Sequence, residues 1–273
     1  LLPFISSIIL LIFSIAIVVK INKIELEKNR TRELSLLVHD GLIAFFKKIL
    51  SSTLQIIIYL IIVLLVFSFV FNKSFSWPQI IAFILGSVVM TFITYSGFIM
   101  SSKFVPRVIK KSNVFSAGMD VLFKSSIAIS FLFISVVILG LLTTILFFGI
   151  EALIGYSLGV ILSSFFIRIG GGMFKAGSDV GSDLLSEKDK DCPLDRRNPA
   201  TLLDITGDYV GLVVGFSSDL LGSYVFSLVS CVLFAYALYK GNLITSTAVL
   251  KLIELPFFII AIAASEVAIG LGL

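Results

Sequence analysis

The chain has 273 residues, of which 58% are hydrophobic and only 14% are charged, and its mean hydropathy is +1.11. Because soluble domains carry about 25% charged residues, this composition excludes an ordinary soluble protein. The formal net charge of +4 needs no nucleic-acid partner to explain it.

Apolar runs follow one another along the whole chain, and a transmembrane helix needs roughly 20 apolar residues. Lipid offers backbone groups no hydrogen-bond partner, so such runs cross a bilayer as helices. We therefore predict an all-α integral membrane protein, a single transmembrane domain over 1–273 with about seven transmembrane helices. Five runs approach or exceed bilayer length, and two more carry one acidic residue each: Leu1–Val19, Thr53–Phe71, Ile80–Met100, Ile127–Ile150, Leu153–Ile167, Tyr209–Leu238 (with Asp219) and Leu255–Leu273 (with Glu266).

Lysine and arginine predict the orientation of these helices. The expected loops Lys20–Leu50, Ser101–Lys124 and Arg168–Arg197 hold seven, five and six of them, whereas Asn72–Gln79 holds only Lys73. Basic loops face the cytoplasm, so we expect a multi-pass protein with these loops on that side. His39 is then expected as a solvated loop residue.

The acidic residues are concentrated in one region. Nine of the seventeen lie between Asp179 and Asp219, in a segment (168–219) that we interpret as a substrate and metal region with a cytoplasmic loop at 186–199. Asp179 and Asp183 are spaced i, i+4, as are Asp204 and Asp208, so each pair shares one helix face.

Two such pairs on neighbouring helices would form a box of four carboxylates. Anions so close repel one another unless cations intervene, and oxygen ligands suit Mg²⁺, which commonly links carboxylates to phosphate oxygens. The alternative is four solvated carboxylates at helix ends. The glycines at 181, 207 and 211 favour the metal site, because a solvated face has no need of close backbone approach.

Two further charges lie deeper. Arg168 precedes Asp179 by eleven residues and Asp219 follows Asp208 by eleven, so both lie about 16 Å below the carboxylates on antiparallel helices. We expect them to pair, because either charge alone in a bilayer is costly. The pair is either a static link between helices or a gate on an ion path.

These residues carry a family resemblance. The stretch "GYSLGVILSSFFIRIGGGMFKAGSDVGSDLL", followed by "DRRNPA", "LLDITGDYVG" and "SSDLLGSY", resembles the membrane-bound pyrophosphatases that pump H⁺ or Na⁺. Weaker similarity lies in "HDGLIAFFKK" and "FSAGMDVLFKSS". The chain starts without Met and both ends fall inside apolar runs, so we expect it to be part of a longer family member.

The resemblance implies cytoplasmic pyrophosphate held by several Mg²⁺ ions, hydrolysis by an activated water, ion transport through a gate beneath, and a homodimer. By position it makes Arg168 and Asp219 gate residues. It makes metal and pyrophosphate ligands of four residues: Asp179, Asp183, Asp204 and Asp208.

The sequence also departs from the family pattern. Ala176 stands where the family has its substrate-binding lysine, and Lys175, one place earlier, is the candidate replacement. Leu194 replaces the loop glutamate, and Phe226 replaces an acidic residue that assists pumping. Leu212 stands where the family has the aspartate that helps to activate water, so we name no catalytic residue.

Two functions follow from this pattern. The first is an ion-translocating inorganic diphosphatase that is complete only together with further chain. The alternative is a non-catalytic paralogue or fragment that binds metal-phosphate or only assembles in the membrane. General-base help is typically worth 10²–10⁴-fold in rate, so losing the water-activating aspartate predicts binding without matching catalysis.

Overall fold

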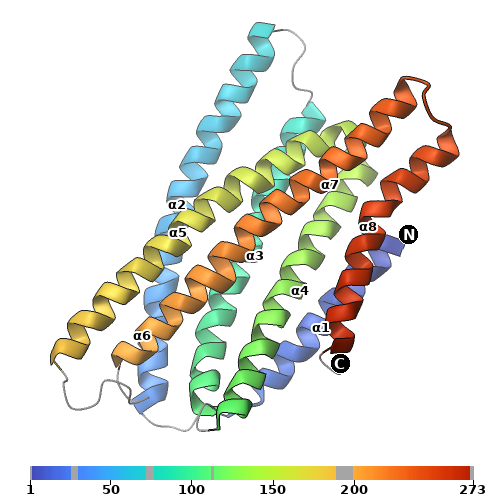
Figure 1. Cartoon of the computed structure of the whole chain (residues 1–273). Coiled ribbons are helices and arrows are strands. Elements are labelled where there is room, and N and C mark those ends of the chain that lie inside the picture. Colours follow the sequence, from blue (N-terminus) through green and yellow to red (C-terminus); the bar gives the residue numbers. More distant parts are fainter. Residues whose placement is uncertain (1, 26–29, 72–76, 112–113, 189–198, 271–273) are drawn as a thin grey trace.

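A computed structural model of the chain describes residues 2–25, 30–71, 77–111, 114–188 and 199–270 (Figure 1). Residues 189–198, which make up most of the expected loop at 186–199 and include Leu194, lie outside this set.

In the described residues every regular element is helical (Figure 1). The helix α6, the π-helix η2 and the helix α7 follow without a break and form one long rod, so the described elements make seven rods. Their bounds are α1 Leu2–Asn22, α2 Arg30–Phe71, α3 Trp77–Lys111, α4 Phe115–Phe148, the 3₁₀ turn η1 Ile150–Ala152, α5 Leu153–Lys188, α6 Pro199–Asp208, η2 Tyr209–Phe216, α7 Ser217–Lys240 and α8 Ser246–Gly270.

The membrane class is confirmed. Within the described residues, six helical segments are long and apolar enough to cross a bilayer. The helix α8 covers most of the seventh expected run but begins earlier, at Ser246, and carries Lys251 and Glu254. The six segments are Pro3–Asn22, His39–Val63, Trp77–Lys111, Phe115–Phe148, Ile150–Leu185 and Ala200–Lys240.

The helices are longer than the apolar runs suggested, and the expected basic loops are largely helical. The helix α2 begins at Arg30, inside the expected loop Lys20–Leu50, and α3 runs on to Lys111. Hydropathy marks only the part of a helix that lies in lipid, while lysine, arginine and glutamate are good helix formers in water. The expectation of three long loops was therefore wrong.

His39 is also not a solvated loop residue. It lies in α2, is partly buried, and its Nδ1 is 2.7 Å from the Ser102 hydroxyl of α3. This contact, with the ring of Phe46 tilted against those of Tyr95 and Phe98, holds the basic end of α2 against α3.

The helices α3 and α5 are in close backbone contact at three glycines. A Cβ on Gly155 would lie 1.9 Å from the Gln79 carbonyl oxygen, and one on Gly159 would lie 2.1 Å from that of Phe83. On the opposite helix, a Cβ on Gly86 would lie 2.3 Å from the Tyr156 carbonyl oxygen. Small residues commonly allow such approach between membrane helices. Because α5 also carries the acidic region, this contact fixes the helix that positions the site.

Candidate functional site

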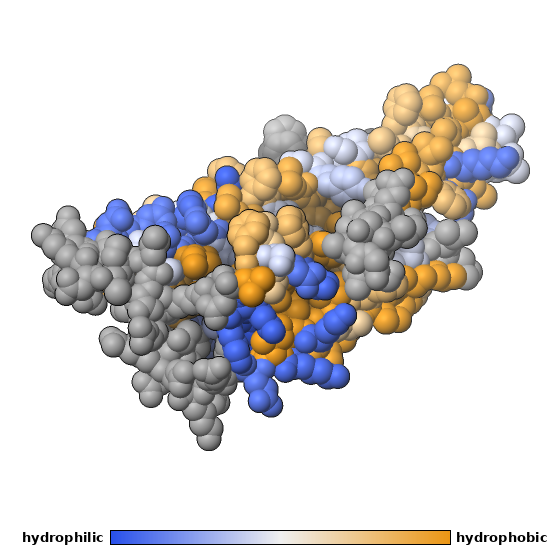
Figure 2. Space-filling view, turned by 60° about the horizontal axis from the view of Figure 1, so that its bottom comes forward, coloured by the Kyte–Doolittle hydropathy of each residue, from blue (hydrophilic) through white to orange (hydrophobic). Residues whose placement is uncertain are grey.

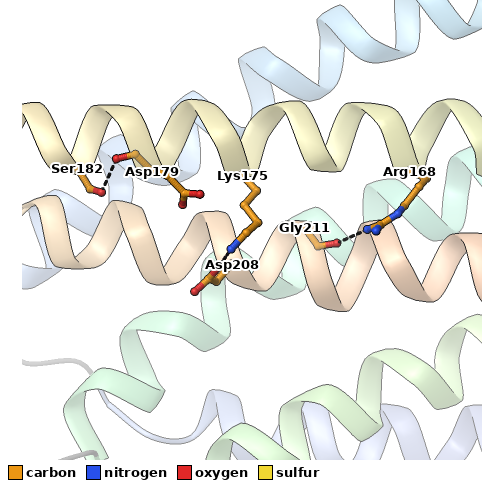
Figure 3. A network of polar contacts seen from close by, with 6 residues as sticks. All are labelled: Arg168, Lys175, Asp179, Ser182, Asp208 and Gly211. Atoms are coloured by element: carbon orange, nitrogen blue, oxygen red, sulfur yellow. Dashed lines mark hydrogen bonds and ion pairs between the residues drawn. The ribbon is translucent and has the colours of Figure 1, made fainter.

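One face of α5 points at the rod formed by α6 and η2. Arg168, Lys175 and Asp179 are spaced i, i+7 and i+11, and Figure 3 shows all three side chains directed toward the facing helix. Asp179 also accepts a hydrogen bond at its backbone carbonyl from the Ser182 hydroxyl, 2.8 Å away. The facing helix contributes the Asp208 side chain and the Gly211 carbonyl.

Glycines allow these two helices to approach. A Cβ on Gly207 would lie 2.4 Å from the Ser178 Cβ, and one on Gly211 would lie 3.0 Å from the Cβ of Lys175. Gly171 and Gly215 oppose each other, with a Cβ on Gly171 only 3.2 Å from the Gly215 Cα. The expected close approach is present at Gly207 and Gly211, whereas a Cβ on Gly181 would meet only the Leu203 side chain, at 3.1 Å. Helix packing accounts for it, so these glycines are not by themselves evidence for a ligand.

Lys175 and Asp208 form an ion pair between α5 and α6 (Figure 3). The Lys175 stem passes over Gly211, where a larger residue would block its path. The two side chains remain 37% and 47% exposed, so water and dissolved ions can reach the pair. Lys175 therefore faces the site, whereas Ala176, the position at which the family lysine aligns, is exposed.

The four candidate metal ligands are not gathered into one cluster. Asp179 faces α6 and Asp208 is paired with Lys175, while Asp183 and Asp204 are exposed. Across the described residues, no three histidine, cysteine or acidic side chains lie close enough together to hold a metal ion. The donor chemistry suits Mg²⁺, but the geometry does not form the expected box, and the assignment of these residues as ligands stays a prediction.

Arg168 does not pair with Asp219. Its guanidinium donates to the Gly211 carbonyl at 3.3 Å and lies over the ring of Phe216, 5.3 Å from the centroid. Among the ion pairs of the described residues there is none between Arg168 and Asp219. The expected pairing was wrong because η2 is a π-helix, bonded i to i+5, and its wider turn changes the direction of every later side chain. The Gly170–Gly172 triplet, in contrast, is regular α-helix.

Two of the described positions at which the sequence departs from the family pattern, Leu212 and Phe226, face away from the core. Leu212 lies in η2 and is 57% exposed, and Phe226 in α7 is 51% exposed. An apolar side chain at position 212 can neither accept a proton from water nor orient it by a hydrogen bond.

The length of α5 separates the candidate gate from the candidate ligands. Its 36 residues span about 54 Å, whereas the hydrocarbon core of a bilayer is about 30 Å thick. If the span begins at Leu153, Arg168 lies within the hydrocarbon and Asp179 beyond it. Figure 2, which brings the lower end of Figure 1 forward, shows hydrophilic residues gathered at this end and hydrophobic residues over the flanks.

Two contacts of this site were not expected from the sequence. The ion pair between Lys175 and Asp208 joins residues 33 positions apart, and the stacking of Arg168 on Phe216 depends on the π-helix. The sequence signal that could have revealed the ion pair is Gly211, because a glycine there leaves room for the long Lys175 side chain of the antiparallel helix α5.

Comparison with known proteins gives a family model and relatives that agree with one another. The family model described as inorganic H⁺ pyrophosphatase matches residues 8–272. A protein of Clostridium tetani named "Putative K(+)-stimulated pyrophosphate-energized sodium pump" is 29% identical over 242 residues, which are 87% of this chain and 35% of that protein. A protein of Chloroflexus aurantiacus named "K(+)-insensitive pyrophosphate-energized proton pump" is 27% identical over 198 residues, 70% of this chain and 26% of that protein.

A third relative, from Methanosarcina mazei and also named "K(+)-insensitive pyrophosphate-energized proton pump", is 26% identical over 248 residues, 89% of this chain and 35% of that protein. The chain thus spans between about a quarter and a third of the length of these relatives.

Proposed function

The chain belongs to the inorganic H⁺ pyrophosphatase family, and on that premise we propose that it is part of a membrane-bound pump that couples hydrolysis of magnesium pyrophosphate to transport of H⁺ or Na⁺. The observation that carries this proposal is the facing arrangement of Lys175 and Asp179 on α5 and Asp208 on α6. A cation and carboxylates held on two rigid helices suit a phosphate anion that arrives with Mg²⁺.

We propose the segment 168–219 as the substrate region, with Asp179, Asp183, Asp204 and Asp208 as ligands of magnesium pyrophosphate and Lys175 as a phosphate contact. Without substrate, Lys175 neutralises Asp208. A phosphate group near Lys175 would compete for its ammonium and leave the Asp208 carboxylate available to a metal ion. The 37% and 47% exposure of this pair supports that exchange, because the partners need no rearrangement of the core to part.

Three further parts of the proposal rest on the resemblance. Arg168 and Asp219 are candidate gate residues, supported by the depth of Arg168 on α5, within reach of the hydrocarbon. The site end of the bundle faces the cytoplasm, supported by the basic residues near it. The protein forms a homodimer.

A second candidate function is binding without catalysis. Leu212 is 57% exposed on η2 and stands where the resemblance places a water-activating aspartate. A chain that keeps Lys175 and the four aspartates but lacks this group would hold magnesium pyrophosphate and turn it over slowly or not at all.

Calorimetric titration of the chain in detergent tests the proposed site. Mg²⁺ and pyrophosphate together should bind more tightly than either alone, because each neutralises charge on the other. Asp183→Asn and Asp208→Asn should each remove that gain. Lys175→Met should strengthen binding of Mg²⁺ alone, because it frees the Asp208 carboxylate, and should weaken binding of pyrophosphate.

The matched control is Asp120→Asn. Asp120 pairs with Lys124 on α4 at 2.7 Å, is 57% exposed and lies outside the proposed site, so its loss should leave the gain intact. Wild-type synergy in the Asp208→Asn variant would mean that these carboxylates are a solvated face.

A further inference from the structure

A cavity opens between α2 and α3, at the side of the bundle. Its volume is about 440 Å³, within the roughly 300–1,000 Å³ of small-molecule sites. It is lined from α2 by Phe46, Leu50, Leu54 and Ile57, and from α3 chiefly by Val88 and Phe92. Figure 1 shows α2 leaning away from the rest of the bundle toward its Phe71 end.

This groove does not require hydrogen-bonding groups on the molecule that occupies it. Two of its lining hydroxyls are already satisfied by the helix: Ser87 donates to the Phe83 carbonyl at 3.0 Å, and Thr91 donates to the Ser87 carbonyl at 2.9 Å. Leu54, Val88 and Phe92 are 47%, 57% and 54% exposed in the helix bundle. An occupant that is hydrocarbon over this length matches such a surface.

The depth of the groove can be placed from α3. Trp77 begins this helix and is 72% exposed, and tryptophan is enriched at the membrane–water interface. A hydrocarbon core of about 30 Å takes up roughly 20 helical residues, so the opposite interface falls near Gly97. The groove runs from Ile84 to Tyr95, so most of it lies in the leaflet on that side.

Lys47 stands at that interface beside the groove, whereas Lys48, one residue further along, points to the opposite side of α2 from the groove-lining residues. The ring of Phe46 lies 5.2 Å from that of Tyr95, so Lys47 and Lys48 are level with the end of the hydrocarbon. Lys47 precedes Leu54 by seven residues, two helical turns, and so shares its face. Both side chains are exposed, and neither ammonium has a partner among the described residues. The nearest carboxylate on that face, Asp40, is another two turns away.

We propose that this groove binds one anionic phospholipid, with an acyl chain along Leu54 and Phe92 and the phosphate at Lys47. An unpaired cation at headgroup depth above an apolar channel fits both ends of such a lipid. A covering protein helix would fill the channel but would leave the Lys47 ammonium without an anion.

Fluorescence quenching in vesicles tests this site. Trp77 is the sole tryptophan, so Trp77→Phe with Phe92→Trp places one reporter in the groove. The control reporter is Phe165→Trp on α5, whose native side chain is also 54% exposed but lines no part of the groove. Vesicles of phosphatidylcholine contain either brominated phosphatidylglycerol or brominated phosphatidylcholine as quencher.

The reporter at position 92 should prefer the brominated anionic lipid by roughly fivefold, the effect of one lysine at the phosphate, and the reporter at position 165 should show no such preference. Lys47→Gln should abolish the preference at position 92, and Lys48→Gln should leave it unchanged. Equal quenching by both lipids at position 92, or the same preference at position 165, would overturn the proposal. Absence of quenching by either lipid at position 92 would also overturn it, because protein would then close the groove.

Native mass spectrometry needs no tryptophan and provides an independent measurement. The unmodified chain should retain phosphatidylglycerol through detergent washing, and the Lys47→Gln variant should lose it. Equal retention by the two proteins would count against Lys47 as the headgroup site.

Discussion

Replacing Gly155 by alanine should force α3 and α5 apart. The added methyl carbon would lie 1.9 Å from the Gln79 carbonyl oxygen, whereas ordinary contact begins at 3.4 Å, so the backbones must separate by about 1.5 Å at this point. The obstacle is backbone, which cannot turn aside as a flexible side chain can. Extra volume in a well-packed core typically costs about 1–3 kcal/mol.

Gly172→Ala is the matched control. Gly172 lies in the same helix, and an added Cβ would meet nothing within 4 Å. Both variants gain the same helix propensity, about 1 kcal/mol. The difference between them therefore isolates the cost of forcing α3 and α5 apart.

Thermal unfolding in detergent measures that difference. At roughly 2–4 °C per kcal/mol for chains of about this size, Gly155→Ala should melt several degrees below Gly172→Ala, and Gly159→Ala should behave like Gly155→Ala. Equal melting temperatures for Gly155→Ala and Gly172→Ala would refute the close contact between α3 and α5.

Two predictions concern orientation and catalysis. In a Cys231→Ala background, the native Cys192 and a Lys23→Cys residue should react with an impermeant thiol reagent only from the cytoplasmic side, since basic segments stay inside; reaction of Cys192 from outside would reverse the proposed topology. The 273-residue chain should release no phosphate from pyrophosphate above background, and in the longer pump proposed above Leu212→Asp should raise the rate, by up to the 10²–10⁴-fold typical of a general base. Rapid magnesium-dependent release by the unmodified chain would show that another group does this work.

The membrane class could be predicted from the sequence because it depends on composition alone, while the helix ends could not. The helices α2 and α3 continue beyond their apolar stretches to Arg30 and Lys111, and hydropathy does not detect that continuation. For the same reason, hydropathy predicted His39 to lie in a solvated loop, although its side chain contacts Ser102. Helix propensity and contacts between helices determine where these helices end and where His39 lies, and hydropathy contains neither kind of information.

At the candidate site, sequence spacing correctly predicted which residues share a face of one helix. It predicted only in part which residues of two helices meet. Lys175 and Asp179 share a face, as the i, i+4 spacing required, because both lie in uninterrupted α-helix. The cross-helix ion pair between Lys175 and Asp208 depends on which residues of α6 lie opposite α5, and the sequence of neither helix states that register.

The π-helix explains why the depth of Asp219 along the bundle was predicted better than the direction of its side chain. Ser178 lies against Gly207 and Gly171 against Gly215, so the antiparallel register brings Arg168 to within about a turn of the level of Asp219. The position of a residue along the helix axis is the sum of the rises of the residues before it, and a wider turn changes that sum only slightly. Direction adds up as an angle of about 100° per residue, so the eight π-helical residues from Tyr209 to Phe216 turn Asp219 away from Arg168, which contacts Phe216 instead. Leu212 lies inside this segment, so the direction of any carboxylate introduced there is likewise set by η2.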